Sequence, residues 1–465
     1  MTTSADLSVF VAGQWTQGRG ELLASKSPLD DKVFWSKHAA SHDDVRAAID
    51  AARLAQPAWE ATPLADREAA LRRFADIAAS RKDAIAQTIH REMGKPIAEA
   101  EAEAGAIVGK VQLTIDAYNQ RRAETTIDMA GKTGRTWYKA IGVVGVLGPF
   151  NFPMHLPAGH IIPALLSGNT VVFKPSEITP ACGEMLASLM NEAGLPDGVL
   201  NLVQGGREVG QALAEDRDVN GLLFTGGSMA GKALQRSFGE TPERILALEL
   251  GGNNPIVVHQ PGDIDAAVAD VITSAFVTSG QRCTCARRLI VTPDSRHVVD
   301  RIVEEAAKLD LAPVATERAA ASVIDAQRKL EDTGGNVLLR AARLEDRGRC
   351  YVSPGVIDVT NIDAGGDDEV FGPLLQVVRV GDLDEAIKAA NATRYGLAAG
   401  LISADDDAWQ KFRREVRAGI INRNTPITGA SGKLPFGGVG ESGNFRPSGF
   451  FAVDYCSYPV ASVEA

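Results

Sequence analysis

The order of apolar and polar residues divides the chain into a helical first part and an alternating second part. Before residue 125, apolar residues recur at the three- and four-residue spacing of an amphipathic helix. This spacing predicts helices over residues 43–54, 66–93 and 96–118. Residues 125–138 are polar and contain two glycines, so this segment predicts an exposed excursion or hairpin.

From residue 141 onward, short apolar runs alternate with stretches of helical spacing. The strand-like runs cover 143–147, 170–173, 199–203, 221–224 and 245–250, and the helical stretches between them include 180–193 and 208–214. A second region of the same kind extends from about residue 255 to residue 421, with helices over 264–277 and 298–308 and a strand over 289–291. Strands that alternate with helices indicate a parallel sheet, so we predict an α/β fold with two such regions.

The length and charge of the chain narrow the class of protein. Its 465 residues suggest two or three domains, and the formal net charge of −11 argues against a nucleic-acid partner, which needs a basic face. No apolar stretch approaches the ~18 residues of a membrane span, and the N-terminus lacks the pattern of a signal peptide. The five cysteines are odd in number and mostly scattered, which argues against a disulfide framework. We therefore expect a cytoplasmic protein with no membrane or nucleic-acid partner.

Two loops after predicted strands are candidate cofactor sites. Gly226–Gly231 opens a predicted helix, whose free N–H groups suit a pyrophosphate; a plain turn is the alternative. The segment nearly matches a P-loop, but Ala233 stands where a hydroxyl would hold magnesium, which argues against that site. Lys174 and Glu177 follow another strand, where a ribose could bind, or where they simply form a solvated loop.

Two reactive side chains are the candidate catalytic residues. Glu249 lies inside an apolar run, where desolvation would raise its pKa toward that of a general base, unless it lies on an exposed strand edge. Cys283 lies among small and polar residues with three arginines within five positions, and nearby cations favour the nucleophilic thiolate. An inert buried thiol is the alternative, and we favour it for Cys285. No H-E-x-x-H motif is present, so we expect no metal.

Taken together and in order, seven motifs resemble the aldehyde dehydrogenase superfamily over nearly the whole chain. They are GPFNFP (148–153), FKPSE (173–177), FTG (224–226), ELGG (249–252), GQRC (280–283), EVFGP (369–373) and PFGG (435–438). The resemblance implies that Cys283 attacks an aldehyde to give a thiohemiacetal and then a thioester. It also implies that Asn151 and the Cys283 N–H hold the oxyanion, and that Glu249 activates the water that releases the acid.

The resemblance implies NAD as the cofactor. Lys174 and Glu177 would hold the adenosine ribose, and Glu177 favours NAD because a 2′-phosphate would meet a like charge. Glu369 would bind the nicotinamide ribose, with Phe371 beside it. The pyrophosphate would lie on Gly226, Gly227, Ser228, Met229, Ala230 and Gly231. Gly227 departs from many relatives, which have Ser there, and leaves the cofactor preference less certain.

The resemblance also implies a domain plan. A Rossmann-like cofactor domain would comprise residues 1–124 and 140–250, and a catalytic α/β domain residues 251–425. A small β extension, residues 125–139 and 445–465, would build a homodimer or homotetramer. Residues 309–321 lack a segment usual in relatives, and we expect a shortened surface connection there, away from the catalytic motifs.

A narrower resemblance concerns the substrate. HLPAGHI (155–161), LNLVQGGR (200–207), GGNNP (251–255), the segment 274–288 and NFRPS (444–448) are similar to family members that oxidise a semialdehyde carrying two carboxylates. Arg282, Arg423 and Arg446 are the candidate cations for these carboxylates. Another carboxylated semialdehyde and an acylating enzyme that uses coenzyme A are the alternatives, although Glu249 argues against acyl transfer. A catalytically silent structural relative is a third, which the presence of Cys283, Glu249 and Asn151 disfavours.

Overall fold

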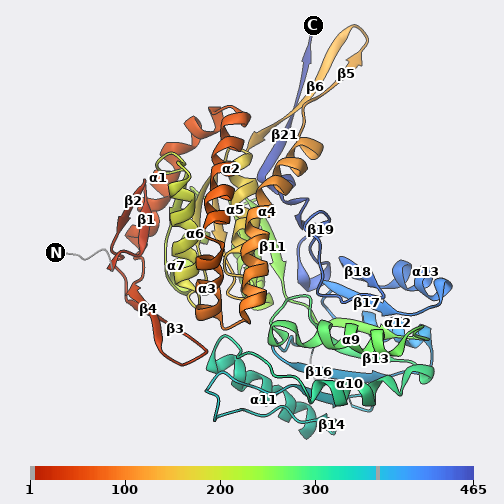
Figure 1. The fold of residues 1–465 in the computed structure, drawn as a ribbon. Coiled ribbons are helices and arrows are strands. Elements are labelled where there is room, and N and C mark those ends of the chain that lie inside the picture. Colours follow the sequence, from red (N-terminus) through yellow and green to blue (C-terminus); the bar gives the residue numbers. More distant parts are fainter. Residues whose placement is uncertain (1–5, 363–366) are drawn as a thin grey trace.

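The computed structural model describes residues 6–362 and 367–465, and its first half is built on a seven-stranded sheet (Figure 1). The strand order is β11-β10-β7-β8-β9-β1-β2, and the strands from β11 to β9 are parallel. The bounds are β1 (Val9–Val11), β2 (Gln14–Thr16), β7 (Val143–Leu147), β8 (Thr170–Lys174), β9 (Leu200–Leu202), β10 (Gly221–Gly226) and β11 (Ile245–Leu250).

Helices cover both faces of this sheet, as the continuous apolar runs of its strands require. The bounds are α1 (His42–Ala61), α2 (Leu64–Ser80), α3 (Lys82–Met93), α4 (Ile97–Arg121), α5 (His155–Leu166), α6 (Pro180–Glu192), α7 (Arg207–Glu215) and α8 (Ser228–Phe238). Side chains alternate across a strand, so Val144 and Val146 of β7 pack with α2 to α6, whereas Val143 and Leu147 pack with α1, α7 and α8.

The second half is built on another seven-stranded sheet, in the order β14-β15-β16-β13-β12-β17-β18. All neighbours are parallel except β14 and β15. The strands are β12 (Asn254–Val258), β13 (Ala286–Val291), β14 (Asn336–Leu339), β15 (Gly355–Asp358), β16 (Leu374–Arg379), β17 (Ala398–Ile402) and β18 (Ile420–Arg423). The helices are α9 (Ile264–Phe276), α10 (Val298–Ala306), α11 (Glu317–Asp332), α12 (Leu383–Asn391) and α13 (Asp406–Glu415). Ile256 of β12 packs with α9 and α10, and its neighbour Val257 packs with α12 and α13.

A three-stranded antiparallel sheet projects from the first domain, with the C-terminus near its tip (Figure 1). It comprises β5 (Thr125–Met129), β6 (Lys132–Ala140) and β21 (Ser457–Glu464). The remaining elements are β3 (Leu22–Lys26), β4 (Val33–His38), β19 (Pro435–Phe436), β20 (Ser448–Gly449), and the 3-10 turns η2 (Val277–Gly280), η3 (Pro293–Ser295), η4 (Gly440–Ser442) and η5 (Ala452–Cys456).

The predicted α/β class with two parallel-sheet regions is confirmed, and two details differ. The predicted helix over 66–93 is two helices, because Arg81 leaves helical geometry (φ −114°, ψ 19°) and serves as the end of α2 and the start of α3. In the segment 445–465, only β21 joins the projecting sheet. Ala452, Tyr455 and Cys456 instead pack into the core of the first domain.

Candidate active site

A cavity of about 1330 Å³ lies between the two sheet domains. On one side it meets the carboxyl ends of β7, β8, β10 and β11, where open parallel sheets bind ligands. Its volume exceeds the roughly 300–1000 Å³ of an ordinary ligand pocket. The space is therefore sufficient for two ligands side by side.

The cavity lining contains most of the side chains that the sequence singled out. They are Asn151, Lys174, Glu177, Gly226, Gly227, Ser228, Met229, Ala230, Glu249, Arg282, Cys283, Glu369 and Phe371. Gly231, Arg423 and Arg446 are not among the lining residues. The structure therefore brings a thiol, three carboxyl groups and a side-chain amide from distant parts of the chain to one space.

The Cys283 thiol is half-buried, and its pKa is raised to about 12 by burial and by the charges of Glu369 and Glu249. The expected thiolate is therefore wrong for this structure. The neighbouring arginines bind other groups: Arg282 pairs with Glu99, and Arg287 pairs with Glu369. Their positive charge is largely neutralised before it reaches the sulfur.

The third arginine, Arg288, is also turned away from the thiol. Its guanidinium donates to the backbone oxygens of Asn253, Ala389 and Ala390, at 2.8–3.0 Å. Arg287 and Arg288 thus support the surrounding backbone, and Arg282 binds the side chains of Glu99 and Thr278. The sequence spacing that suggested thiolate activation therefore reflects a structural role.

A strained turn precedes Cys283. Thr278, Ser279 and Gly280 have φ angles of 53°, 54° and 73°, in the left-handed region that only glycine adopts freely. A Cβ on Gly280 would lie 2.3 Å from the carbonyl oxygen of Gly372. Glu99 of α4 accepts hydrogen bonds from the backbone N–H and the hydroxyl of Thr278. The turn is therefore fixed from outside, which is typical of strain at a functional site.

The segment 309–321 is part of this support, and its expected distance from the catalytic motifs is wrong. Ser279 Oγ donates to the oxygen of Ala312 at 2.6 Å, and the Ala315 N–H donates to Gln281 Oε1 at 2.9 Å. Thr316 lines the cavity itself. Contacts with a strained loop far along the chain leave no periodic signal in the sequence.

Glu249 lies at the carboxyl end of β11 with 4% of its surface exposed. Oε1 accepts a hydrogen bond from the Ser448 N–H at 3.1 Å, and among the described residues Oε2 has no partner. Burial raises the pKa of this carboxyl to about 8, although the hydrogen bonds from Ser448 oppose the shift. Such a group can take a proton near neutral pH.

The alternative of an exposed strand edge for Glu249 is wrong, even though β11 is an edge strand. The segment 443–449 covers that edge. Asn444 Oδ1 accepts from the Leu248 N–H at 3.0 Å, and its Nδ2 donates to the Leu246 oxygen at 2.8 Å. Gly443 forms a bridge with Glu249 itself. A side chain thus satisfies the edge groups that a further strand would otherwise pair.

Asn151 is buried in the loop after β7, and its Nδ2 donates to the Gln281 oxygen at 3.0 Å. Lys95 Nζ donates to the backbone oxygen of Asn151 at 2.7 Å and pairs with Glu103 at 2.6 Å. Both side chains of this ion pair are fully buried. The second oxygen of Glu103 accepts from the N–H groups of Met154 and His155 at 3.1 Å, at the start of α5. The pair thus fixes the backbone from Asn151 to the start of α5.

Sequence reasoning missed Lys95 and Glu103. One signal could have found Glu103: it lies on the apolar face of α4, between the buried Ala100 and Ile107. A charge on the buried face of a helix is costly unless it is paired or used.

The start of α8 lines one part of the cavity. No side chain caps this helix, so its first N–H groups are available to an anion. A Cβ on Gly227 would meet nothing within 4 Å, so the space above the turn is open. Gly231 has a packing role, because a Cβ there would lie 2.6 Å from the side chain of Leu250. Met229 is exposed.

Lys174, at the end of β8, and Glu177 line the same cavity. Lys174 Nζ donates to the oxygens of Pro175 and Gly205 at 2.7 and 2.6 Å, and lies 3.6 Å from Glu177 Oε2. Burial lowers the pKa of Lys174, and the Glu177 charge opposes that shift. Glu177 remains half-exposed and lines the cavity.

Glu369 and Phe371 lie where the two domains meet. A Cβ on Gly251 would lie 1.7 Å from Glu369 Oε2, so only glycine fits beside this carboxyl group. Burial raises the pKa of Glu369, and Arg287, 3.2 Å away, opposes the shift. The ring of Phe371 meets Phe150 edge-on, with the ring centroids 5.8 Å apart.

The predicted substrate arginines are not free to bind a carboxylate in the cavity. Arg282 lines the wall, but Glu99 and Thr278 hold its guanidinium. Arg423 pairs with Asp406 on α13. Arg446 is exposed and donates to the Phe445 oxygen at 3.3 Å. The expectation that Arg423 and Arg446 reach the cavity is wrong, because their strand and loop direct them elsewhere.

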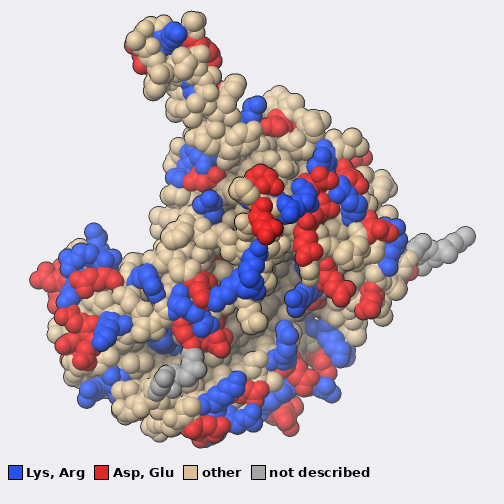
Figure 2. All heavy atoms as spheres, turned by 180° about the vertical axis from the view of Figure 1, so that it is seen from behind, with Lys and Arg blue, Asp and Glu red and all other residues tan. Residues whose placement is uncertain are grey.

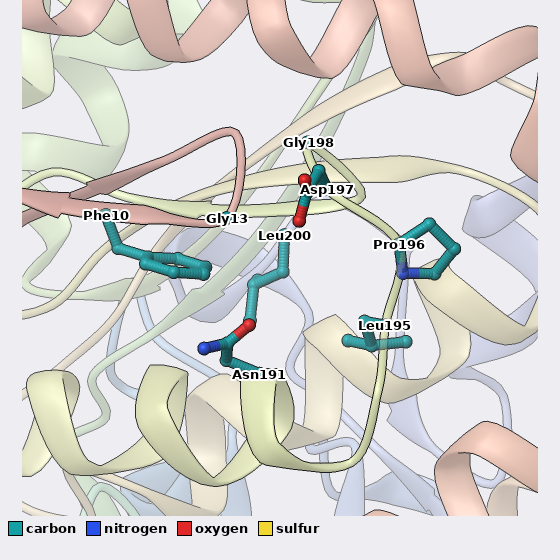
Figure 3. A pocket seen from close by; sticks show the side chains of 8 residues that line it. All are labelled: Phe10, Gly13, Asn191, Leu195, Pro196, Asp197, Gly198 and Leu200. Atoms are coloured by element: carbon teal, nitrogen blue, oxygen red, sulfur yellow. The ribbon is translucent and has the colours of Figure 1, made fainter.

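We also searched the described residues for a metal site, a membrane-spanning helix, a charged patch and a second pocket. Within residues 6–362 and 367–465, no group of three His, Cys, Asp or Glu side chains is placed to hold a metal ion, and no helix is long and apolar enough to cross a membrane. Acidic and basic side chains are interspersed over the face in Figure 2. A second hollow near the β1–β2 hairpin has about 10 Å³, room for one water (Figure 3).

Comparison with known proteins agrees with this arrangement. The profile of the aldehyde dehydrogenase family matches residues 15–459. An N-succinylglutamate 5-semialdehyde dehydrogenase of Vibrio cholerae serotype O1 is 48% identical over 469 residues, 98% of this chain and 96% of the relative. The enzyme of the same name from Caulobacter sp. (strain K31) is 48% identical over 470 residues, with the same shares covered.

A solved structure is similar as well. It is a 1-pyrroline-5-carboxylate dehydrogenase from Thermus with bound NAD. Its TM-score to this chain is 0.94 at 29% identity, and the match covers 99% of this chain and 93% of the other. The two-domain architecture is therefore shared along the whole length.

Proposed function

The chain belongs to the aldehyde dehydrogenase family, and from this premise we propose that it uses NAD to oxidise N-succinyl-L-glutamate 5-semialdehyde to N-succinyl-L-glutamate. Membership makes the chain an NAD(P)-dependent aldehyde oxidoreductase and confirms the predicted family. The choice of substrate is supported by relatives of that name, which are 48% identical over almost the full length.

The observation that carries the proposal is the convergence of Cys283, Glu249 and Asn151 on one cavity. They supply a nucleophile, a buried carboxyl group and an amide donor, which together suit acyl chemistry on a carbonyl carbon.

The reaction begins when Cys283 Sγ attacks the aldehyde carbon. The high pKa of the thiol means that its proton must leave to solvent as the bond to carbon forms. One Asn151 N–H is already bound to the Gln281 oxygen, so the other is available to the developing oxyanion together with the Cys283 N–H. The product of this step is a thiohemiacetal.

The two-electron oxidation that converts the thiohemiacetal to a thioester is the chemistry that NAD supplies when bound. Glu249 then takes a proton from water, and the resulting hydroxide attacks the thioester carbonyl. Cys283 leaves as the thiolate and regains its proton, while the acid departs. A pKa near 8 makes Glu249 a stronger base than an exposed carboxylate, which suits the removal of a proton from water.

The residues present fit NAD. The uncapped start of α8 and the open space above Gly227 accommodate a pyrophosphate. Lys174 and Glu177 would hold the adenosine ribose, and the Glu177 carboxylate favours a free 2′-hydroxyl over a 2′-phosphate. Glu369 would accept from the nicotinamide ribose, with Phe371 beside it.

One panel of aldehydes, assayed with NAD and with NADP, tests the proposal. We expect kcat/KM for N-succinyl-L-glutamate 5-semialdehyde to exceed that for uncharged aliphatic aldehydes, and NAD to be preferred. Equal kcat/KM values across the panel would exclude this substrate class. The assay contains no coenzyme A, so a requirement for coenzyme A would identify an acylating enzyme instead.

We also propose that the projecting sheet builds a homodimer or homotetramer. Several large apolar side chains are exposed on it: Ile127, Met129, Trp137, Tyr458 and Val463. Exposed apolar residues gathered on one extension suit a protein interface. We retain the reducing cytoplasm as the compartment, since all five cysteines are unpaired in the structure.

A further inference from the structure

Lys110 of α4 is a buried cation that the reaction above does not use. Only 8% of its surface is exposed, and the side chain lines the cavity. Among the described residues, no hydrogen-bond or ion-pair partner is found for its ammonium group. An isolated charge in a buried position is costly, so it calls for an explanation.

The ammonium lies where α4, α5 and the loop 428–432 meet. Nζ is 3.8 Å from the position that a Cβ on Gly159 would take, and 3.7 Å from the corresponding position at Gly432. Both glycines also line the cavity. The absence of a side chain at these two positions keeps the space around the ammonium open.

The acidic side chains of α4 that line the cavity are already bound to other partners. Glu103, two turns earlier on α4, is held by Lys95 and two backbone N–H groups. Glu99 is held by Arg282 and Thr278. No acidic side chain in this part of the described structure neutralises Lys110. Burial lowers the pKa of Lys110 to about 8, so the group is still mainly charged at pH 7.

A second polar group shares the space. His155 lines the cavity, and its buried Nδ1 has no partner in the described structure. Burial and the charges of Lys110 and Lys95 lower the pKa of this imidazole to about 3, so it is neutral and can donate one N–H. A cation and a neutral donor without partners match an anionic oxygen ligand.

We propose that Lys110 Nζ binds a carboxylate of the substrate, beside His155, and thereby makes the enzyme selective for carboxylated semialdehydes. This inference rests on the proposed function and supplies the cation that Arg423 and Arg446 do not. The alternative is a lysine whose stem merely fills the cavity wall.

The test compares Lys110→Met with wild type on two substrates, N-succinyl-L-glutamate 5-semialdehyde and hexanal. We expect kcat/KM for the semialdehyde to fall about 10- to 100-fold, the range for losing a hydrogen bond to a charged group. The value for hexanal should stay within about twofold, because that aldehyde has no carboxylate to pair. The melting temperature should hold or rise, since an unpaired buried charge is removed.

Two further variants separate binding from structure. Lys82→Met removes the same charge at an exposed position that packs against α4 near Gly105, and it should leave both substrates unaffected. Lys110→Arg keeps the charge and should retain part of the preference. If Lys110→Met does not fold, the ratio of kcat/KM for the semialdehyde to kcat/KM for hexanal is measured in Lys110→Gln instead.

Three results would overturn the proposal. They are an equal loss on both substrates, an unchanged preference in Lys110→Met, and failure of both neutral variants to fold while Lys82→Met folds. If wild type itself shows no preference for the semialdehyde, the proposed function fails instead. An unchanged preference in Lys110→Met beside a preferring wild type refutes the role of Lys110 alone.

Discussion

Glu249 lies in the cavity with one carboxylate oxygen bound to the Ser448 N–H and the other unpartnered among the described residues. In the proposed reaction this group activates the water that releases the acyl group from Cys283. Glu249→Gln keeps the shape of the side chain but removes the base. We expect it to release about one NADH per site and then stall, which rapid-mixing absorbance would record.

Cys283→Ala is the matching control, because it should abolish even the first NADH. Steady turnover by Glu249→Gln at the wild-type rate would remove Glu249 as the deacylation base.

The raised pKa of Glu249 also predicts how stability depends on pH. The folded state holds a proton on this carboxyl up to about pH 8, whereas the unfolded chain loses it near the ordinary value of 4.5. The free energy of unfolding that this group contributes is therefore fully present below pH 4.5 and is lost as pH rises through 8. Glu249→Gln lacks this loss, so its melting temperature should gain on wild type by a few degrees, roughly, between pH 5 and pH 9.

The exposed Glu101→Gln serves as the control for that comparison and should follow wild type at both pH values. A constant difference between Glu249→Gln and wild type across this pH range would contradict the raised pKa.

At the scale of single residues, the sequence predicts the direction of the pKa shift of Glu249 but not that of Cys283. Glu249 was expected to have a raised pKa because its neighbours are apolar, and the structure has such a shift. The thiolate of Cys283 was inferred from nearby arginines, but each guanidinium is bound to a partner far along the chain. Distance along a sequence does not say where a long side chain points.

At the scale of elements, the buried ion pair between Glu103 of α4 and Lys95, which follows α3, holds the loop that contains Asn151. Glu103→Gln would leave Lys95 without its counter-charge, 2.7 Å from the Asn151 oxygen. We expect a loss of about 3–5 kcal/mol in the free energy of unfolding. A shift of the Asn151 amide should also lower kcat by about 10- to 100-fold.

Denaturant unfolding and steady-state kinetics would measure both effects. Glu101→Gln, two residues earlier on the exposed side of α4, should change neither. A Glu103→Gln enzyme with wild-type stability and kcat would show that the pair does not position the loop.

Elements with their own periodic pattern were predictable, and elements fixed by distant contacts were not. β7 and β11 match the predicted runs residue for residue, because strands buried on both faces read as continuous apolar segments. Residues 312–316 support the turn before Cys283, and Asn444 covers the edge of β11. Both arrangements depend on individual hydrogen bonds between distant residues. Such bonds carry no periodicity, so the pattern gave no sign of them.

At the scale of the whole molecule, the projecting sheet is the part that a monomer leaves exposed (Figure 1). We expect Ile127→Asp, which places a charge on a side chain that is 64% exposed in the single chain, to reduce the oligomer toward a smaller species. Light scattering after gel filtration would measure the mass. Leu54→Asp makes the same change on an exposed residue of α1 and should leave the mass unchanged. An unaltered mass for Ile127→Asp would place the interface elsewhere.

We propose that this chain forms a thioester on Cys283 from a carboxylated semialdehyde and that Glu249 activates the water that hydrolyses it. The most direct test is the intact mass of Glu249→Gln after one turnover with N-succinyl-L-glutamate 5-semialdehyde and NAD, without coenzyme A. We expect that the protein gains the mass of one N-succinylglutamyl acyl group, and that Cys283→Ala gains none. An unchanged mass, or the same gain in the protein that lacks Cys283, would contradict it.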